Sequence, residues 1–347
     1  LTGVVDAAVL DLGPVIRSVY PNDGPEPQPN TGIDADREKP FSLPEVVSNL
    51  DIDLRLAIDQ IVGVPGELRN ATARLFFGDG RLRLPASLNV LGTTVGGEAI
   101  LSRQEEIMKL SVELAADKTD LGRVAGEWYG GAGVAGRLDG LELSASASGA
   151  SLSALLKNLD ARLDIRNVDL TIDGKSASRP MRVVLDAATV TLPAGAGLKG
   201  TVTGKMIGQS FSLNVAGGGM RDILEKSRWP VDLRFVGSGA RLHLAGIFSP
   251  LGDTAGPELS IRLSGDRIGA LAAWTGISPS ATMPYVMDAA GSLHRNRWRL
   301  EVRRLNLGNS TLRGSIGGKL SANRQLKASL SVHSDSIDVA QLNTLFI

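Results

Sequence analysis

Histidines, cysteines and short catalytic motifs are the features that would reveal acid–base chemistry or metal binding in a sequence. The three histidines, His243, His294 and His333, lie far apart, and each falls within a strand-like pattern. Because a zinc site needs clustered ligands, we interpret them as histidines on strand surfaces. The chain has no cysteine, which excludes disulfides, thiolate metal sites and a cysteine nucleophile. It has no G-x-S-x-G elbow, H-E-x-x-H helix or P-loop. The sequence therefore predicts a protein that is not an enzyme and has no metal or cofactor.

Two further patterns match chemical motifs but fit structural roles better. Asp51, Asp53 and Asp59 could form paired carboxylates, yet they alternate with leucines and isoleucines, which is typical of the polar side of a strand. Gly131–Gly136 matches the dinucleotide fingerprint G-x-G-x-x-G, but a strand-like run follows it instead of a phosphate-binding helix. We interpret this segment as a glycine-rich loop between strands.

A cluster of arginines around Trp298 has two interpretations. It comprises Arg295, Arg297, Arg299, Arg303 and Arg304. Such a patch could meet anionic headgroups near a membrane. It could also protect an edge strand from pairing with other chains, and this is the interpretation that the sequence favours.

The elements that must position these side chains are strands. Apolar and polar residues alternate from Leu50 to Asp59, which is the period of a strand with one apolar face. Similar runs recur along the chain between glycine-rich turns, of which Gly78–Gly80 is a hairpin signal. Pro85 is expected to interrupt the run that follows this turn, and two separate short strands are expected at 181–185 and 188–192. No crossover of about a dozen residues, as parallel strands need, separates them. The sequence predicts an all-β fold with a few short helices, in which an elongated, mostly antiparallel curved sheet forms a hydrophobic groove.

Short helices are expected at a few places. Leu152–Leu159 carries leucines at i, i+3, i+4 and i+7, and Ser151 or Ser153 is suited to be its N-cap. Further helical segments are expected at 120–128, 220–226, 266–275 and 338–345. A pattern of strand, leucine-rich helix and return strands occurs near 141–172 and 259–302, with a weaker copy near 110–143. This is the pattern of a degenerate internal repeat.

The apolar side of the predicted strands is the candidate binding surface. It could be the filled core of a closed sandwich, or it could line an open groove that holds acyl chains; the sequence leaves both open. Low aromatic content and frequent glycine suit a smooth, strongly curved sheet. The residues expected to bind lipid are Leu50, Ile52, Leu54, Leu56, Ile58, Leu163, Ile165, Leu170, Val231, Leu233, Phe235, Leu259, Ile261, Leu263, Leu300 and Leu330.

Composition and segmentation narrow the classes of partner. Lysine plus arginine and aspartate plus glutamate both number 37, so the 347-residue chain has no net charge and no basic footprint for nucleic acid. No apolar run approaches the roughly 20 residues that span a bilayer. We expect a strand at 1–19 that continues from a missing N-terminal region, a proline-rich linker at 20–40 and one β region at 41–347. Any membrane anchor would then precede residue 1.

Several segments, in order, resemble the C-terminal periplasmic region of the AsmA family of Gram-negative envelope proteins, which are related to TamB. The segments are FSLPEVVSNLDIDLRLAIDQI from Phe41, LRNATARLFFGDGRLRL from Leu68, GTTVGGEAILS from Gly92, GASLSALLKNLDARLDI from Gly149 and LNLGNSTLRGSIGGKLS from Leu305. The resemblance covers most of the chain from about Phe41 onwards.

The resemblance implies a non-catalytic bridge-like lipid transfer protein. Such a protein lies in the periplasm, is anchored to the inner membrane by an N-terminal helix that is missing here, and carries phospholipid acyl chains along an apolar β-groove between the inner and outer membranes. The implied partners are phospholipids or other envelope lipids and an outer-membrane or periplasmic protein. The alternative function is a periplasmic scaffold for outer-membrane protein biogenesis that pairs with clients through edge strands. An extracellular β enzyme or adhesin fits less well.

Overall fold

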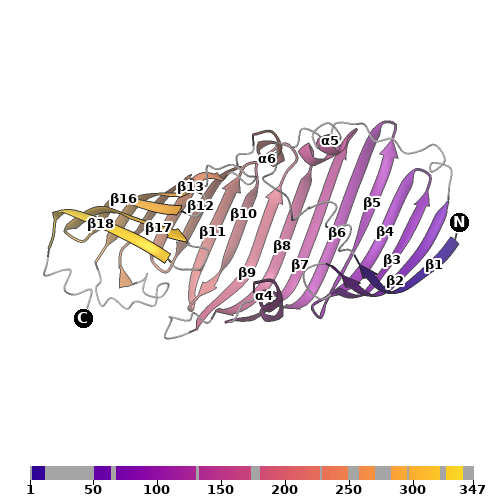
Figure 1. The fold of residues 1–347 in the computed structure, drawn as a ribbon, viewed down its shortest axis with the longest axis horizontal. Coiled ribbons are helices and arrows are strands. Elements are labelled where there is room, and N and C mark those ends of the chain that lie inside the picture. The colour runs from indigo at the N-terminus through magenta and orange to yellow at the C-terminus, as the bar shows by residue number, and fades with distance from the viewer. Residues whose placement is uncertain are drawn as a thin grey trace. The chain divides into compact units, whose positions relative to one another are not determined.

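A computed structural model describes residues 2–11, 51–63, 68–129, 133–172, 180–226, 229–248, 258–269, 283–294, 297–320 and 326–338. The described part is predominantly β-strand with three short helices, and its sheet is curved, open and not closed into a barrel. The predicted all-β class is therefore confirmed (Figure 1). None of the described helices has the length and apolarity needed to cross a bilayer. Two predictions fall on residues outside the described ranges: the lipid-binding residue Leu50 and the proline-rich segment Pro21–Pro29. Of the predicted helix at 338–345, only residue 338 is described.

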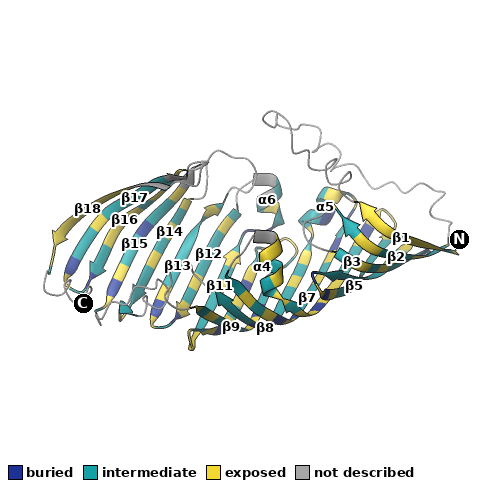
Figure 2. Cartoon of the chain, turned by 60° about the horizontal axis from the view of Figure 1, so that its bottom comes forward, coloured by how far each residue is buried: buried dark blue, intermediate teal, exposed yellow. Residues whose placement is uncertain are grey.

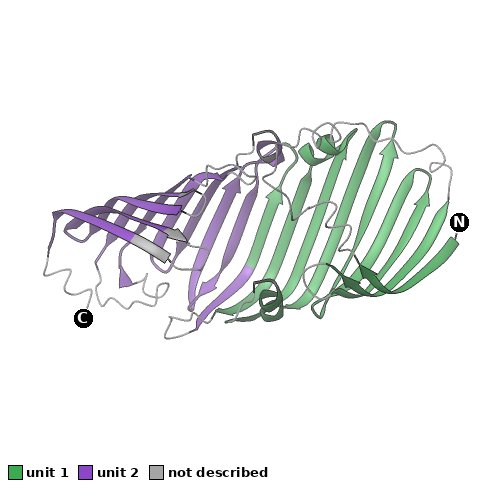
Figure 3. Cartoon of the chain, in the orientation of Figure 1, with its two compact units in different colours: residues 1–172, 187–195 green, residues 173–186, 196–347 purple. Residues whose placement is uncertain are grey.

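Two compact units divide the chain (Figure 3). Unit 1 contains residues 1–172 and 187–195, and unit 2 contains residues 173–186 and 196–347, so the division falls within β9 (Met181–Leu192). The strands of unit 1 are β1 (Thr2–Asp11), β2 (Ile52–Val62), β3 (Leu68–Gly78), β4 (Arg81–Val90), β5 (Thr93–Gln104), β6 (Ile107–Asp120), β7 (Val134–Gly149) and β8 (Asp160–Ile172). Those of unit 2 are β10 (Lys199–Met206), β11 (Gln209–Gly217), β12 (Trp229–Gly237), β13 (Ala240–Phe248), β14 (Glu258–Gly265), β15 (Tyr285–His294), β16 (Arg297–Leu307), β17 (Ser310–Leu320) and β18 (Leu326–Ser336).

Consecutive strands pair antiparallel within each unit, from β2 to β8 and from β10 to β18. Several joining turns place two successive residues at positive φ, as Asp79–Gly80 and Ser238–Gly239 do. This is the two-residue hairpin turn whose twist matches that of the strands. One pairing departs from the predicted meander, because β1 runs parallel to β2, with Thr2 opposite Asp53 and Asp11 opposite Val62.

The strand register sorts the side chains of unit 1 onto two faces. Leu114 lies opposite Leu143, which lies opposite Leu163, and the adjacent row is Glu113, Ser144 and Arg162. Asn167 in β8, where φ is 51°, and the residue opposite it, Asp139 in β7, are both left out of the pairing. The register continues past them without a shift, so that Leu138 lies opposite Val168. The apolar residues change from odd to even positions at this point in both strands. We call the two sides of each unit the apolar face and the charged face.

Unit 2 repeats the same arrangement. Leu233, Leu244 and Ile261 lie opposite one another across β12, β13 and β14, and the adjacent row is Arg234, His243 and Arg262. The strong alternation of the sequence is thus converted by register into continuous rows across neighbouring strands. Each unit has an apolar face and a charged face of its own.

Glycines on the apolar face show the direction in which each unit bends. A Cβ atom on Gly97 in β5 would lie 2.1 Å from the carbonyl oxygen of Glu113 and 3.0 Å from Cα of Leu114. Gly246 in β13 has the same surroundings, 2.1 Å from the Glu258 carbonyl oxygen and 3.0 Å from Cα of Leu259. The neighbouring backbone therefore approaches on the apolar side at both places. We infer that the apolar face is the inside of the curve.

Arginine–carboxylate pairs connect strands on the charged faces. Arg74 donates two hydrogen bonds to Asp53, at 2.8 Å and 2.7 Å, and its guanidinium lies 4.1 Å from the ring centre of Phe76. Arg83 pairs with Glu98. The hydrogen bond from Arg74 lowers the pKa of Asp53, and that from Arg83 lowers the pKa of Glu98. These pairs are largely exposed, so each contributes little alone and is screened by salt.

In the part of the chain that the structure describes, three short helices lie at the ends of strands. They are α4 (Leu121–Tyr129), α5 (Leu152–Lys157) and α6 (Met220–Lys226). Ser151 caps α5 by accepting a 3.2 Å hydrogen bond from the Ala154 N–H, which confirms one of the two predicted caps. The predicted helices at 120–128 and 220–226 are also confirmed within a residue or so, whereas most of 266–275 lies outside the described residues.

Two details of the predicted strands are wrong. Pro85 does not interrupt the chain but lies within β4, opposite Glu98 of β5. Between β3 and β4 the register passes from Ala73–Ala86 to Phe76–Arg83 without pairing Pro85, so the missing N–H of proline falls where the ladder is already interrupted. The two short strands expected at 181–185 and 188–192 form the single strand β9.

Substituting Gly97 with alanine tests the inferred bend. Because the new methyl group would meet the backbone of β6, we expect Gly97→Ala to lower the free energy of unfolding by about 1–3 kcal/mol. Gly96→Ala is the matched control, since a Cβ atom there meets nothing within 4 Å. It should be neutral or slightly stabilising. Urea denaturation of both variants measures the difference, and equal stabilities would contradict the close approach.

Acidification tests the charged faces. Since the folded-state pKa values of Asp53 and Glu98 are lowered, their contribution is fully present above the ordinary carboxyl pKa of about 4 and is lost as pH falls through the lower folded values. We expect the melting temperature to decline below about pH 4. Asp53→Asn should melt below the wild type at pH 7, and the difference should shrink as the pH falls through the lowered folded-state pKa of Asp53. The exposed Asp59→Asn serves as control, and a gap for Asp53→Asn that persists in acid would refute the assignment.

Candidate functional site

The apolar faces hold every predicted lipid-binding residue that the structure describes. Those in unit 1 are Ile52, Leu54, Leu56, Ile58, Leu163, Ile165 and Leu170, and the register places them on one side of the sheet. Those in unit 2 are Val231, Leu233, Phe235, Leu259, Ile261, Leu263, Leu300 and Leu330, again on one side. Leu50 lies outside the described residues. Their role in binding lipid stays a prediction.

Burial distinguishes an open face from a filled core. All of these residues are half-buried except Leu330, whose exposed fraction is 68% (Figure 2). In the centre of a closed sandwich, rows of Leu and Ile opposite one another would be fully buried. Half-burial is what neighbouring side chains alone provide when no second layer covers them. At the described residues, the open face is therefore the alternative that the structure supports.

Complete burial occurs mainly near strand ends and helices. In unit 1, Leu155 of α5 is buried, and α5 packs so closely that a Cβ atom on Gly149 would lie 2.6 Å from the Leu155 nitrogen. Asn158 donates a 2.9 Å hydrogen bond to the Ser148 carbonyl oxygen, which fixes the end of the helix to β7. At the other end of β7, the first turn of α4 meets the backbone, where a Cβ on Gly122 would lie 3.1 Å from the Val134 carbonyl oxygen. Helices α4 and α5 thus contact the two ends of β7, and neither covers the middle of the apolar face.

Aromatic side chains line part of the apolar face of unit 2. Phe211 and Phe235 stack with ring centres 5.5 Å apart. Tyr285, which is 2% exposed, lies against Gly265, and burial followed by the charge of Asp266 raises the pKa of its phenol. Among the described residues its buried hydroxyl has no hydrogen-bond partner. Sequence reasoning missed Phe211 and Tyr285 as members of the face, although Phe211 alternates correctly with Leu213 and Val215.

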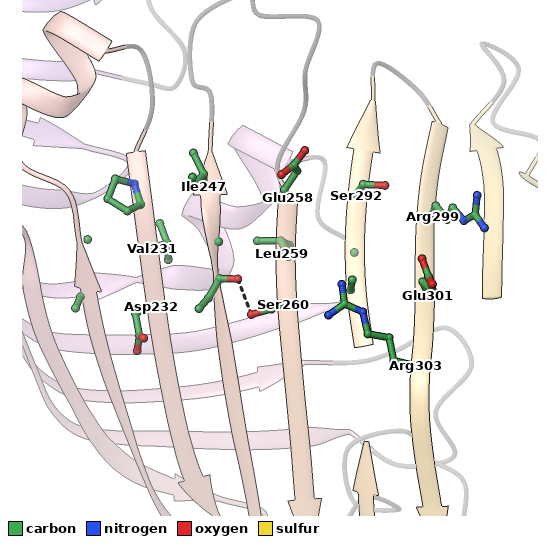
Figure 4. Close-up of a pocket in the computed structure, with 17 residues that line it drawn as sticks. Val231, Asp232, Ile247, Glu258, Leu259, Ser260, Ser292, Arg299, Glu301 and Arg303 are labelled. Carbon is green, nitrogen blue, oxygen red and sulfur yellow. Dashed lines mark hydrogen bonds between the residues drawn. The ribbon is translucent and has the colours of Figure 1, made fainter. Parts of the chain in front are cut away.

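The charged face of unit 2 carries a shallow hollow of about 850 Å³ (Figure 4). Its floor consists of small residues, among them Ala216, Ala245 and Ala290. Glu258 and Arg303 are among the charged residues around it. The hollow lies on the side opposite to the apolar face, because Ala245 shares its row with Asp232 and Ser260. Val231 and Leu259, which belong to the predicted lipid-binding residues, also border it.

The closest approach to a catalytic arrangement is a histidine–aspartate pair. His243 Nε2 lies 2.9 Å from Asp232 Oδ2, and Arg234 donates a 3.0 Å hydrogen bond to the other oxygen. These contacts, first that of His243 and then that of Arg234, lower the pKa of Asp232. The pair belongs to the polar row of the charged face and fits a structural role.

The other candidates for chemistry are dispersed. Asp53 is held by Arg74, Asp51 and Asp59 are exposed, and His333 lies exposed on β18. His294 lies in β15, far along the chain from His243. Within the described residues no group of three or more His, Asp or Glu could hold a metal ion. Of the segment Gly131–Gly136, the described part leads into β7 and not into a helix.

The arginines around Trp298 lie in β16, which is an inner strand because it pairs with both β15 and β17. Arg297, Arg299, Arg303 and Arg304 are exposed, and Arg295 lies outside the described residues. Protection of an edge strand, which the sequence favoured, therefore does not explain this cluster. The alternative, contact with anionic headgroups, stays a prediction.

Comparison of the chain with protein-family models, with curated proteins and with solved structures finds no match. The resemblance to the AsmA family thus rests on the sequence segments quoted above.

Proposed function

We propose that this chain is a non-catalytic lipid-binding and lipid-transfer protein that holds acyl chains along the apolar faces of its open sheet. The observation that carries the proposal is the half-exposed row of apolar side chains that runs across strand after strand in each unit, for example Leu114, Leu143 and Leu163. Burying apolar area is favourable by about 25 cal/mol per Å², so such a face favours an apolar occupant. Soluble proteins rarely expose contiguous apolar surface of this kind without a function.

Acyl chains suit this surface better than a rigid ligand does. A site for a defined small molecule places a few polar groups among apolar ones to fix its orientation. The rows of Leu, Ile and Val on the apolar faces offer few such groups, so they favour flexible hydrocarbon with little regard to its exact length. A lipid would then keep its headgroup in water on the open side and move by sliding from one set of side chains to the next.

The resemblance to the AsmA family extends the proposal to the cell. On that basis the lipids are phospholipids or other lipids of the Gram-negative envelope, and transfer runs between the inner and outer membranes through the periplasm. An N-terminal inner-membrane anchor and an outer-membrane or periplasmic partner belong to the same proposal. The charged faces, with their arginine–carboxylate pairs, suit contact with water on the outside of the curve.

Aspartate substitutions on the two faces test the proposal. An aspartate at Leu54 can stay hydrated on an open face, so Leu54→Asp should fold and lose about 1 kcal/mol or less, but it should lower acyl-chain crosslinking at β2 roughly tenfold or more, because a charge in hydrocarbon is costly. Ala57→Asp, on the charged face of the same strand, is the matched control. Leu233→Asp and Val236→Asp, the latter at a residue that is 49% exposed, form the corresponding pair in unit 2.

Bound lipid and the folding of Leu54→Asp separate the alternatives. Native mass spectrometry of protein purified from membranes should show bound lipid for the wild type and for both controls. If Leu54→Asp fails to fold, the apolar face is a closed core; if it folds and retains its lipid, β2 is outside the lipid path. A protein that carries no lipid at all would support the scaffold for outer-membrane protein assembly.

Alanine substitutions of Asp232 and His243 test the proposed absence of catalysis. Because the pair lies on the charged face, we expect each variant to transfer lipid between vesicles at the wild-type rate, with at most a small loss of melting temperature. Loss of transfer in His243→Ala with unchanged stability and unchanged bound lipid would show a chemical role that this proposal lacks.

A further inference from the structure

The two compact units carry opposite charge (Figure 3). Unit 1 contains 16 lysines and arginines against 25 aspartates and glutamates, and unit 2 contains 21 against 12. The net charges of the units are therefore −9 and +9, although the chain as a whole is neutral. Lipid binding on the apolar faces makes no use of this separation of charge. It points to a partner that itself carries charge.

Part of the positive charge of unit 2 is concentrated in β16. The exposed arginines of this strand are Arg297, Arg299, Arg303 and Arg304. Within the described residues none of them contacts a carboxylate, whereas Arg262 of β14 contacts Asp288 at 2.7 Å. Glu301 is the one acidic residue of β16, so the strand has a net charge of +3. This charge is not neutralised by the strands beside it.

A bulge in β16 brings two of these arginines together on the charged face. The register with β17 leaves Arg303 and Arg304 against the single residue Arg313. The residues on either side of the two, Val302 and Leu305, are half-buried, as residues of the apolar face are, whereas both arginines are exposed. Like charges that face each other destabilise a sheet. The stability of the sheet therefore does not explain this arrangement.

The charged face of unit 1 holds the opposite sign in a similar way. Glu98 of β5 lies directly opposite Glu113 of β6, and Glu142 of β7 lies directly opposite Asp164 of β8. Glu98, Glu142 and Asp164 each contact an arginine of their own unit. Glu113 and, further along β6, Asp117 are exposed and contact no basic residue among those described. These two carboxylates are therefore open to an external partner.

We propose that two copies of this chain associate through these surfaces, so that the charged face of β16 in one copy contacts the charged face of β5–β8 in the other. Arg303 and Arg304 of one copy then pair with Glu113 and Asp117 of its partner copy. The like charges that face each other within each unit are thereby neutralised across the interface. The apolar faces take no part in the contact. The proposal goes beyond lipid transfer, and either can be true without the other.

A second copy of the chain fits the charges better than an unrelated partner does. An acidic protein or an anionic membrane would neutralise unit 2 but would leave unit 1 with its excess of carboxylates. A basic protein would do the reverse. Another copy supplies both signs in equal amount, because the net charges of the two units cancel. Complementary charge of this kind also fixes the orientation of the two partners.

Sedimentation velocity of the full chain tests the association. We expect the wild type to self-associate at about 0.01 M salt, where the Debye length is about 30 Å, and to be monomeric at about 1 M salt, where it is about 3 Å. The double variant R303E/R304E should raise the dissociation constant about tenfold or more, because it places like charges across the interface. K205E/R221E changes the charge of unit 2 by the same amount at two exposed residues outside β16, and it should change the constant far less.

Exchange of the charges makes the result specific. E113R/D117R should also lose self-association, because both of its surfaces are then positive. An equal mixture of R303E/R304E and E113R/D117R should associate although neither variant does so alone, and the chain with all four substitutions should regain self-association at an unchanged net charge. Both double variants should melt at or above the wild-type temperature, since fewer like charges face each other within the sheet.

Three outcomes would overturn the proposal. The first is a wild type that stays monomeric at low salt. The second is self-association of R303E/R304E as strong as that of the wild type. The third is the absence of association both in the mixture and in the chain with all four substitutions.

Discussion

The alternation of side chains between the two sides of a strand is the constraint on which the rest of this structure depends. A shift of one residue in any strand would move its leucines to the charged face and its arginines to the apolar face. Where the apolar pattern changes from odd to even positions, it does so at the same place in both neighbouring strands, as at Asp139 in β7 and Asn167 in β8. The continuity of each apolar face is therefore a property of the register and not of any single side chain.

An open apolar face is possible because the residues that allow the sheet to bend differ from the residues that face water. Curvature comes from positions such as Gly97 and Gly246, where the backbone of the next strand takes the place of a side chain. Solubility comes from the opposite side, where pairs such as Arg74–Asp53 keep charges in water. The rows between are then free to remain apolar without forming a closed core.

The sequence predicts these features unequally. Strong alternation in Ile52–Ile58 and the leucine spacing of the α5 segment are local, and they identify β2 and α5 correctly. The parallel pairing of β1 with β2 could not be predicted, because nothing in either strand specifies a partner so distant in the chain. The prediction for Pro85 was wrong because a proline interrupts a strand only where the neighbouring strand would accept a hydrogen bond from its N–H, and β3 does not pair with Pro85. The charge pairs depend on diagonal and opposite positions that only the register supplies. The open face itself could not be separated from a sandwich core by pattern alone.

The hairpin connectivity from β2 to β8 and from β10 to β18 also has a mechanical consequence. Each strand is held mainly by its two neighbours, so the free energy of the fold is close to a sum over adjacent pairs, as in a solenoid. Such a sheet can gain or lose a hairpin without redesign of a central core. Pulled from the outer strand of a unit, it would peel strand by strand at low force and not rupture in one event. Length is then a variable that evolution can adjust by duplication.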